Sequence, residues 1–393
     1  MKNEMQKIKI AFDASQTGRR KAGCGFYAAA LLNSLLKTSG DIYNFTALTS
    51  YGSFFHDQCH AIAFPEWKKR PNYGPRFLTR NSATLFWNSK KKASAYLDQF
   101  DIVHANNFWC PPWAISGCLI YTLYDMSFLE KPQWTTDKNR TGCLEGIQRA
   151  ALYADIFIAI SEATKQSFLS HFPKISPSRV TVIYPASRYS LPGFNQKPKR
   201  PKELPLNIDK NFFLTVGTIE PRKNQEFLLH IYEEYRRREN PAVPLIFAGK
   251  YGWLMDDFKE RIGKSKWRKD IHILGYVNDN ELMWLYSCCL ANLYPSLYEG
   301  FGLPVLEGMS FGACTVASDK TSMPEIVKES GILLSPHDTE GWIKTLSELA
   351  CSPQKVMHLG NLALTRANDF SWKRSTCSVI SIYEQVRNNG LSL

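Results

Sequence analysis

The sequence predicts two doubly wound α/β domains in tandem, each built on a parallel sheet. Three observations lead to this prediction. The chain has 393 residues, more than one ordinary hydrophobic core supports. Short β-rich apolar runs alternate with helical patterns, and a proline-rich stretch interrupts this alternation once. We expect a first domain over residues 1–190, a linker over 191–208, a second domain over 209–370, and a C-terminal helix over 371–393 that packs back on the first domain.

The first domain is predicted from β-rich runs with helical segments between them. The clearest helical patterns lie at 26–38 and 162–172. The predicted strands are 8–15, 45–50, 101–107, 118–125, 155–161 and 179–185. Strand and helix at this spacing favour a parallel sheet with helices on both faces.

After the proline-rich segment 191–205, the alternation of strand and helix restarts. The predicted strands of the second domain are 212–218, 244–249, 271–277, 290–296, 314–319 and 331–336. In sheets of this kind, ligands bind outside the carboxyl ends of the strands. We therefore expect the binding site in a crevice between the two sheet edges.

The charge balance predicts an acidic partner. The chain has 48 Lys and Arg against 36 Asp and Glu, a formal net charge of +12, which suits phosphates, nucleic acid or an anionic membrane face. The ten cysteines include no C-x-x-C pair, which disfavours a zinc site and favours free thiols in a reducing cytoplasm. No apolar stretch is long enough to span a membrane. We expect a cytoplasmic protein, with peripheral attachment to the inner face of the membrane left open.

The stretch PSLYEGFGLPVLEGMS at 295–310 combines a buried strand, a glycine-rich turn and a helix predicted at 303–313. The N–H groups of Phe301, Gly302 and Leu303 would lie at the start of this helix. Backbone N–H groups and the positive end of a helix dipole make such a helix start a site for anions. We therefore expect a phosphate group here.

Glu299 and Glu307 flank that anion site. Carboxylates repel phosphate but accept hydrogen bonds from hydroxyls. We therefore interpret them as the groups that hold a ribose on one side of a diphosphate and a sugar on the other, as a nucleotide-sugar site requires. The alternative is that Glu307 only interacts with the helix dipole, a contribution of about 0.3–1 kcal/mol.

A second motif, VGTIEPRKN at 216–224, ends the first strand of the second domain at Gly217. Arg222 and Lys223 stand just before the next helix. Two cations there could neutralise a leaving diphosphate, on which negative charge grows as a glycosyl–phosphate bond breaks. The alternative is a pair of solvated charges in front of a helix.

Together these stretches resemble the retaining glycosyltransferases of the GT-B fold, specifically glycosyltransferase family 4 and its bacterial polysaccharide mannosyl- and glucosyltransferases. The most specific match is EGFGLPVLE, the family's two acids separated by seven residues. VGTIEPRKN, AGKYGW, LGYVNDNELMWLY, SMPEIV and ISEATKQ are also similar. The likeness covers most of the chain and is strongest after residue 210. It implies two Rossmann-like domains facing a central cleft, with the acceptor in the first and the nucleotide sugar in the second.

The resemblance also implies residue roles. Glu307 would hold the ribose hydroxyls of the donor, and Glu299 would bind the transferred sugar near the reacting carbon. Lys223 would neutralise the diphosphate, so Glu299 and Lys223 count as catalytic. Retaining members react on the front face, where the leaving phosphate accepts the acceptor proton. No carboxylate nucleophile, cofactor or metal is then expected.

The chain departs from the family pattern at two positions. Many members carry arginine directly after the glycine of the first strand, where this chain has Thr218. We expect Gly217 and Thr218 in the donor-binding loop and Arg222 as the replacement cation. Relatives often have histidine where Tyr124 stands. Tyr124 can donate one hydrogen bond, and we place it in the acceptor site.

The first domain gives weaker signals for the acceptor. Gly23 and Gly25 could cradle a phosphate or an acceptor hydroxyl, although a plain turn explains them equally well. Asp125 could orient the acceptor hydroxyl as a third catalytic residue, or could cap the next helix. The segment 67–92 carries eight Lys or Arg and no acid, which suits an anionic membrane surface and a lipid-diphosphate acceptor. A solvated loop and nucleic-acid binding are its alternatives.

We therefore expect a hexosyltransferase that moves a hexose from a nucleotide sugar, of UDP-glucose or GDP-mannose type, to a saccharide or lipid-linked acceptor with retention, in polysaccharide biosynthesis. One alternative is a GT-B epimerase or hydrolase of nucleotide sugars, which would need a general acid–base pair. The other is a basic nucleic-acid-binding protein, whose binding would fall steeply with salt. No residue indicates which base or which acceptor is used.

Overall fold

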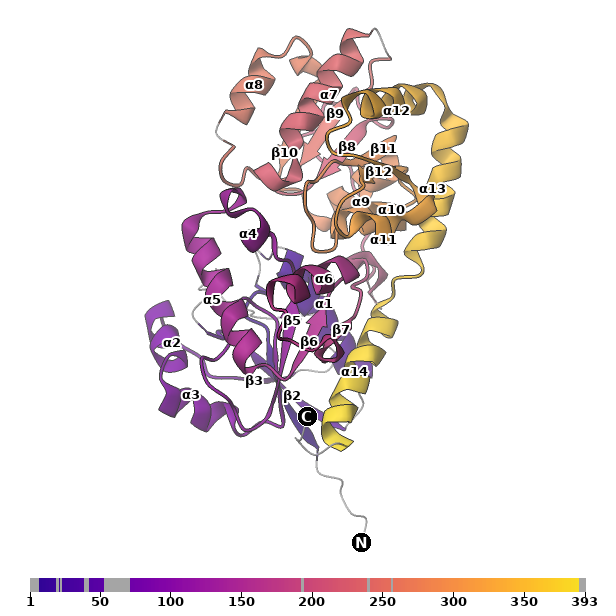
Figure 1. Ribbon diagram of the computed structural model, residues 1–393. Helices are drawn as coiled ribbons and strands as arrows, with labels where there is room; N and C mark the ends of the chain where they lie inside the picture. The colour runs from indigo at the N-terminus through magenta and orange to yellow at the C-terminus, as the bar shows by residue number, and fades with distance from the viewer. Residues whose placement is uncertain are drawn as a thin grey trace. The chain divides into compact units, whose positions relative to one another are not determined.

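The computed structural model describes residues 7–18, 21, 23–38, 42–52, 71–191, 194–238, 241–255 and 257–388 (Figure 1). The chain divides into two compact units. Unit 1 comprises Met1–Pro132, Asp137–Pro192 and Ser371–Leu393, whereas unit 2 comprises Gln133–Thr136 and Gly193–Phe370. The last segment of the chain therefore belongs to the same unit as the first.

Unit 1 contains a seven-stranded parallel sheet in the order β3-β2-β1-β4-β5-β6-β7. Its strands are β1 (Ile8–Asp13), β2 (Tyr43–Leu48), β3 (Asn72–Tyr73), β4 (Ile102–Ala105), β5 (Cys118–Leu123), β6 (Ile156–Ala159) and β7 (Val180–Val182). Every strand predicted for the first domain is present. The additional strand β3 has two exposed residues, so no apolar pattern marked it. Central strands such as β5 are buried throughout, as their continuous apolar runs require in a parallel sheet.

The helices of unit 1 include one from the far end of the chain. They are α1 (Gly23–Thr38), α2 (Arg80–Trp87), α3 (Lys90–Leu97), α4 (Ser127–Glu130), α5 (Asp137–Tyr153), α6 (Glu162–His171) and α14 (Trp372–Asn388). α14 packs against α1, where Thr376 Oγ1 donates to Ser34 Oγ at 2.7 Å. Trp372 Nε1 donates to the carbonyl of Ser187 at 3.0 Å. α14 thus completes the core of unit 1.

Unit 2 contains a six-stranded parallel sheet in the order β10-β9-β8-β11-β12-β13. Its strands are β8 (Phe213–Val216), β9 (Leu245–Ala248), β10 (Ile271–Gly275), β11 (Ala291–Tyr294), β12 (Thr315–Ser318) and β13 (Ile332–Leu334). Its helices are α7 (Gln225–Arg237), α8 (Phe258–Lys264), α9 (Asp279–Cys288), α10 (Leu303–Ser310), α11 (Met323–Val327), α12 (Thr339–Cys351) and α13 (Pro353–Ala367). Every strand predicted for the second domain is present.

The proline-rich segment has neither helix nor strand from residue 194 to 208, but its backbone is held in place. Arg200 donates to the carbonyls of Leu204 at 3.1 Å and Ile208 at 3.2 Å. The backbone N–H of Lys199 donates to the carbonyl of Asn280 in α9 at 2.9 Å. This segment is therefore packed onto unit 2.

Each sheet has one point where the strand order changes direction. This switch point lies between β1 and β4 in unit 1 and between β8 and β11 in unit 2. Doubly wound sheets bind ligands at the carboxyl ends of the two strands that flank such a point. Among the described residues, no helix is long and apolar enough to cross a bilayer.

Candidate functional site

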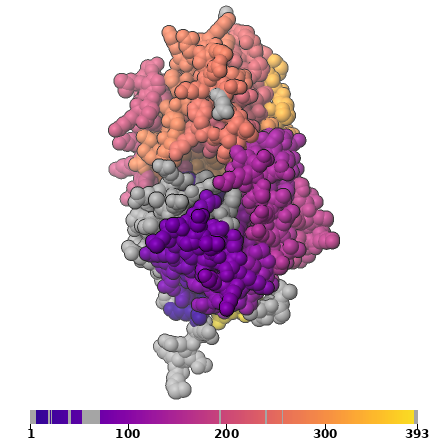
Figure 2. Space-filling model, turned by 90° about the vertical axis from the view of Figure 1, so that its left-hand side faces the viewer, coloured from indigo at the N-terminus to yellow at the C-terminus, as the bar shows by residue number. Residues whose placement is uncertain are grey.

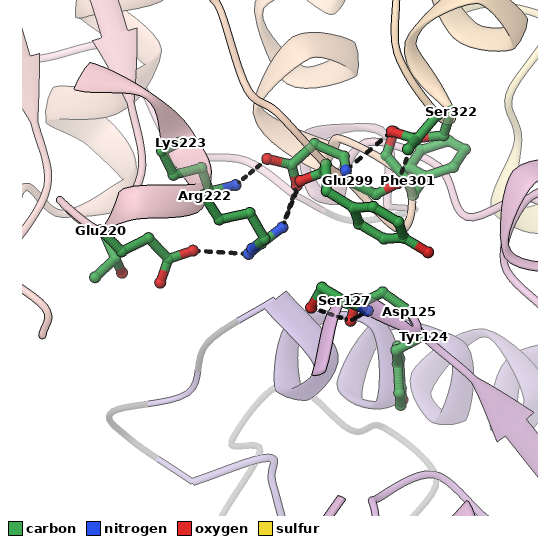
Figure 3. A network of polar contacts seen from close by, with 12 residues as sticks. Tyr124, Asp125, Ser127, Glu220, Arg222, Lys223, Glu299, Phe301 and Ser322 are labelled. Atoms are coloured by element: carbon green, nitrogen blue, oxygen red, sulfur yellow. Dashed lines mark hydrogen bonds and ion pairs between the residues drawn. The ribbon is translucent and has the colours of Figure 1, made fainter. Parts of the chain in front are cut away.

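A buried cluster of charged side chains lies at the switch point of unit 2. The short 3₁₀ helix η4 (Pro221–Lys223) follows β8, and Glu299 follows β11. Lys223 Nζ donates to Glu299 Oε1 at 2.6 Å, and Arg222 Nη1 donates to Glu299 Oε2 at 3.0 Å (Figure 3). The three residues that the sequence assigned to one donor site are therefore in direct contact.

Backbone geometry fixes this contact. Asn224 adopts a left-handed conformation, with φ of 58°, between η4 and α7. Its side-chain nitrogen donates to the carbonyl of Pro295 at 3.2 Å, and the N–H of Leu297 donates to the carbonyl of Arg222 at 2.9 Å. The loops after β8 and β11 are thus hydrogen-bonded to each other, which holds the charged side chains together.

Glu299 is an ionised carboxylate in a buried position, 6% exposed. Burial alone would raise the pKa of Glu299, but the charges of Lys223 and Arg222 outweigh burial and lower this pKa to about 2. Burial lowers the pKa of Lys223, and the Glu299 carboxylate opposes that shift. The carboxylate therefore keeps its charge at any physiological pH.

Two further residues of the cluster were not identified from the sequence. Glu220, 3% exposed, accepts a hydrogen bond from Arg222 Nη2 at 2.8 Å. Tyr294, the last residue of β11, accepts one from Lys223 Nζ at 2.6 Å. Burial raises the pKa of Tyr294 well above its ordinary value. Glu220 lies inside the VGTIEPRKN motif, so the sequence offered it as a candidate. The motif alone did not indicate that its side chain would be buried against Arg222.

The glycine turn leads from Glu299 into α10. Gly302 precedes the helix with φ of +102°, and a Cβ there would lie 2.2 Å from Met323 Cε. Ser322 Oγ donates to the carbonyls of Phe301 at 2.7 Å and Glu299 at 3.1 Å. The left-handed φ and the contact with Met323 thus both require glycine at position 302, independently of the phosphate site predicted from the sequence. Leu303 is the first residue of α10, as predicted.

Glu307 is buried within α10, 4% exposed. The hydroxyl of Tyr286, on α9, donates to Glu307 Oε2 at 3.4 Å. The adjacent Gly308 allows α10 to approach β11, because a Cβ there would lie 2.6 Å from Asn292 Nδ2. Packing of α9 and β11 therefore fixes the position of Glu307.

The loop after β8 is shaped by two glycines. Gly217 has φ of +139°, in the region that favours glycine. A Cβ on Gly249 would lie 1.8 Å from the Gly217 carbonyl oxygen. The carbonyl of Thr218 accepts a hydrogen bond from Gln225 Nε2 at 2.9 Å. Thr218 is therefore held through its backbone, and Arg222 supplies a guanidinium to the cluster.

In unit 1, the two residues at the end of β5 already have partners. Asp125 Oδ1 accepts hydrogen bonds from the Ser127 N–H at 3.0 Å and the Ser127 hydroxyl at 2.6 Å. The N-cap residue of α4 is Met126, so Asp125 contacts the first helical residue from one position before the cap. Tyr124 is buried, and its hydroxyl donates to the carbonyl of Asn106 at 3.0 Å. A hydrogen bond donated by the Tyr124 hydroxyl to the acceptor would require this bond to break.

The two glycines after β1 lie in a helix. α1 begins at Gly23, three residues before the predicted start at residue 26. Gly25 is required by packing, because a Cβ there would lie 2.1 Å from the Gln16 carbonyl oxygen, whereas a Cβ on Gly23 would meet no atom within 4 Å. Of the two glycines, Gly23 is therefore the one whose Cβ position is not in contact with the described residues.

Comparison with known proteins decides the family. Residues 27–186 match the family model described as Glycosyltransferase Family 4, and residues 196–364 match the model described as Glycosyl transferases group 1. The chain belongs to glycosyltransferase family 4. Among its relatives, O-antigen chain mannosyltransferase B of Escherichia coli is 29% identical over 392 residues, which cover 96% of this chain and 100% of that protein.

Solved structures share the fold of this family 4 glycosyltransferase. Sucrose-phosphate synthase from Thermosynechococcus elongatus matches with a TM-score of 0.72 at 18% identity, over 98% of this chain and 100% of that chain. HepE from Anabaena in complex with UDP-glucose matches with a TM-score of 0.72 at 17% identity, over 96% and 100%. The predicted GT-B fold, with two parallel-sheet α/β domains, is confirmed.

No metal site is visible in the part of this glycosyltransferase that the structure describes. There, no group of three or more His, Cys, Asp and Glu side chains could hold a metal ion. Near the carboxyl ends of β8 and β11, the positive charges are those of Arg222 and Lys223.

Proposed function

We propose that this glycosyltransferase moves a hexose, in the first instance mannose, from a nucleoside diphosphate sugar to a saccharide or lipid-linked acceptor with retention, in polysaccharide biosynthesis. The main support for a donor site in unit 2 is the pairing of Lys223 and Arg222 with Glu299 at its switch point. The full-length likeness to an O-antigen mannosyltransferase favours GDP-mannose. UDP-glucose, bound by HepE, is the alternative donor.

The charges of the cluster suggest how the donor is engaged. Glu220 and Glu299 balance Arg222 and Lys223, so the cluster is neutral without ligand. A donor diphosphate competes with Glu299 for both cations. Glu299, once released, accepts hydrogen bonds from hydroxyls of the transferred sugar, while Glu307 accepts those of the ribose.

The bonds that form and break in the chemical step then belong to donor and acceptor alone. The bond between the anomeric carbon and the phosphate oxygen breaks, and the acceptor oxygen bonds to the same face of that carbon. The acceptor proton passes to the leaving phosphate oxygen. Lys223 and Arg222 stabilise the negative charge that grows on this leaving group. Activity should therefore survive EDTA, and a strict Mg²⁺ requirement would contradict this mechanism.

The electrostatics disfavour an epimerase or hydrolase. Such an enzyme needs a general acid near the sugar, and the most effective acids have a pKa close to the working pH. Before the donor binds, the two cations hold the pKa of Glu299 at about 2, so Glu299 meets the donor as a carboxylate and not as an acid.

Thermal unfolding with saturating GDP, UDP, ADP and their sugars tests the donor site. A ligand at 100 times its Kd adds about 2.7 kcal/mol to the unfolding free energy. A shift with GDP and GDP-mannose alone supports mannosyl transfer, and a shift with the UDP series supports glucosyl transfer. The Lys223→Ala variant should lose the shift, whereas Lys259→Ala, an exposed lysine of α8, should keep it. No shift with any nucleotide, or a product of inverted anomeric configuration, would overturn the proposal.

A further inference from the structure

An unusual surface of unit 1 lies over α2 and α3, where side chains that are normally buried stand in water. Leu78 is 103% exposed and Leu85 is 74% exposed, and no large apolar side chain among the described residues is more exposed than Leu78. We call the exposed residues between 72 and 95 the α2–α3 face. This segment forms part of the indigo to purple surface turned toward the viewer in Figure 2.

Helix α2 turns Leu85 outward, and Leu78 lies just before this helix. Ala83 and Trp87, four residues apart on α2, are buried and point inward. Asn81 and Leu85, four residues apart on the opposite side of α2, are exposed. Leu78 stands just before the extended N-cap residue Thr79 and is exposed as well. Trp87 packs against Tyr51 and Trp109, with ring centroids 5.0 and 6.0 Å away. A rigid aromatic cluster thus anchors the inner side of α2.

The charges on this face are all of one sign. The segment that contains the leucines also contains Arg76, Arg80 and the three lysines 90–92, and no Asp or Glu occurs from 71 to 97. The three lysines occupy the first turn of α3, which carries no acid. Cations are unfavourable there because the N-terminal end of a helix dipole is positive. None of the three forms an ion pair with a described residue, so the fold itself does not explain them.

We propose that the α2–α3 face binds an anionic lipid bilayer. Lysine and arginine near an anionic leaflet gain electrostatic attraction, and the aliphatic side chains of Leu78 and Leu85 would enter the boundary between headgroups and acyl chains. A nucleic acid would use the cations but would leave both leucines in water, and no recognition motif accompanies the charges. The face overlaps most of the basic segment 67–92 predicted from the sequence, of which residues 67–70 lie outside the described residues.

Sedimentation of the full-length protein with lipid vesicles tests this proposal. We expect binding to phosphatidylcholine vesicles that contain phosphatidylglycerol, and little binding to phosphatidylcholine alone. Lys90→Gln combined with Lys91→Gln and Lys92→Gln should weaken binding at least about tenfold, and so should Leu78→Ser combined with Leu85→Ser. The matched control changes Lys259, Lys266 and Lys269, three exposed lysines of unit 2, to Gln, and should bind like the wild type.

The outcomes separate this proposal from its alternatives. An equal loss in the matched control would mean that net charge alone drives binding, and would overturn the assignment to this face. Binding that is unaffected by the leucine changes, with tight binding to single-stranded RNA, would favour a nucleic-acid partner. The thermal shift with donor nucleotide should be the same in all these variants, so a failure of the membrane proposal leaves the donor site untouched.

Discussion

At the scale of single residues, Glu299 shows how a buried charge is kept. A carboxylate that is 6% exposed would lose its charge without partners, because removing it from water favours the neutral form. Lys223 and Arg222 each lie within 3.0 Å of one carboxylate oxygen and reverse that preference. The same pairing places two cations where the proposed donor diphosphate would need them.

Replacing Glu299 by glutamine should change how stability depends on pH. The pKa of Glu299 falls from 4.5 to about 2 in the folded protein. Its ionisation therefore stabilises the fold above pH about 4.5, and this contribution is lost as the pH falls toward 2. At about 1.36 kcal/mol per pKa unit, the wild type should lose up to about 3 kcal/mol of its advantage over Glu299→Gln across that range. Urea unfolding at a series of pH values measures this loss.

The control for the Glu299 prediction is Glu226→Gln, which removes a half-exposed acid of α7. Its unfolding free energy should run parallel to that of the wild type over the same pH range. If the wild type and Glu299→Gln lost stability in parallel instead, the depressed pKa of Glu299 would be refuted.

Glu307→Gln should mainly weaken donor binding. The change keeps the volume of a side chain packed against Tyr286 but removes the charge that the ribose hydroxyls would contact. We expect the KM for the donor to rise about tenfold, or about 1.4 kcal/mol, with little change in kcat. Tyr286→Phe is the control, because it removes only the hydroxyl that contacts Glu307. Steady-state kinetics with an unchanged donor KM in Glu307→Gln would reject the ribose role.

At the scale of elements, the sequence predicted what depends on local pattern and missed what depends on packing. The core strands were visible because their apolar runs are continuous. The helices α2 (RNSATLFW) and α3 (KKKASAYL) were not predicted, because each is short and carries only two buried residues. The contact of Glu220 with Arg222 could not be predicted either, because a charge pattern does not show which acid is buried.

The turn that starts α10 gives a test at this scale. Gly302→Ala combines a left-handed φ with a Cβ 2.2 Å from Met323 Cε, whereas Gly312→Ala has a left-handed φ of +73° and its nearest atom at 3.7 Å. The left-handed conformation alone costs about 1–2 kcal/mol, and the clash adds to it only at Gly302. We expect Gly302→Ala to be the less stable variant in urea unfolding and to lose the thermal shift with nucleotide. Equal losses in both variants would show that Met323 moves aside freely.

At the scale of the whole molecule, the chain builds unit 1 from both of its ends. The polar contact that joins them is buried: His104 Nδ1 of β4 lies 2.7 Å from the Tyr383 hydroxyl of α14, and His104 Nε2 lies 3.0 Å from Thr122 Oγ1. Burial lowers the pKa of His104 to about 3, so the imidazole is neutral and one nitrogen donates while the other accepts. The neutral form stabilises the fold above pH about 6.5, and that contribution is lost as the pH falls toward 3.

Tyr383→Phe should therefore weaken unit 1 selectively. The change leaves one buried nitrogen of His104 without its hydrogen-bond partner, which should lower the free energy of unfolding of unit 1 by about 1–3 kcal/mol. We expect faster hydrogen–deuterium exchange in peptides from β4 and β5, with exchange in β8 and β9 unchanged. The matched control is Tyr235→Phe in α7, which removes a hydrogen bond from a buried tyrosine hydroxyl to the Pro241 carbonyl and should loosen β8 and β9 alone. If either variant accelerated exchange equally in both sheets, the two units would unfold as one cooperative body, and the helix from the end of the chain would stabilise the entire enzyme.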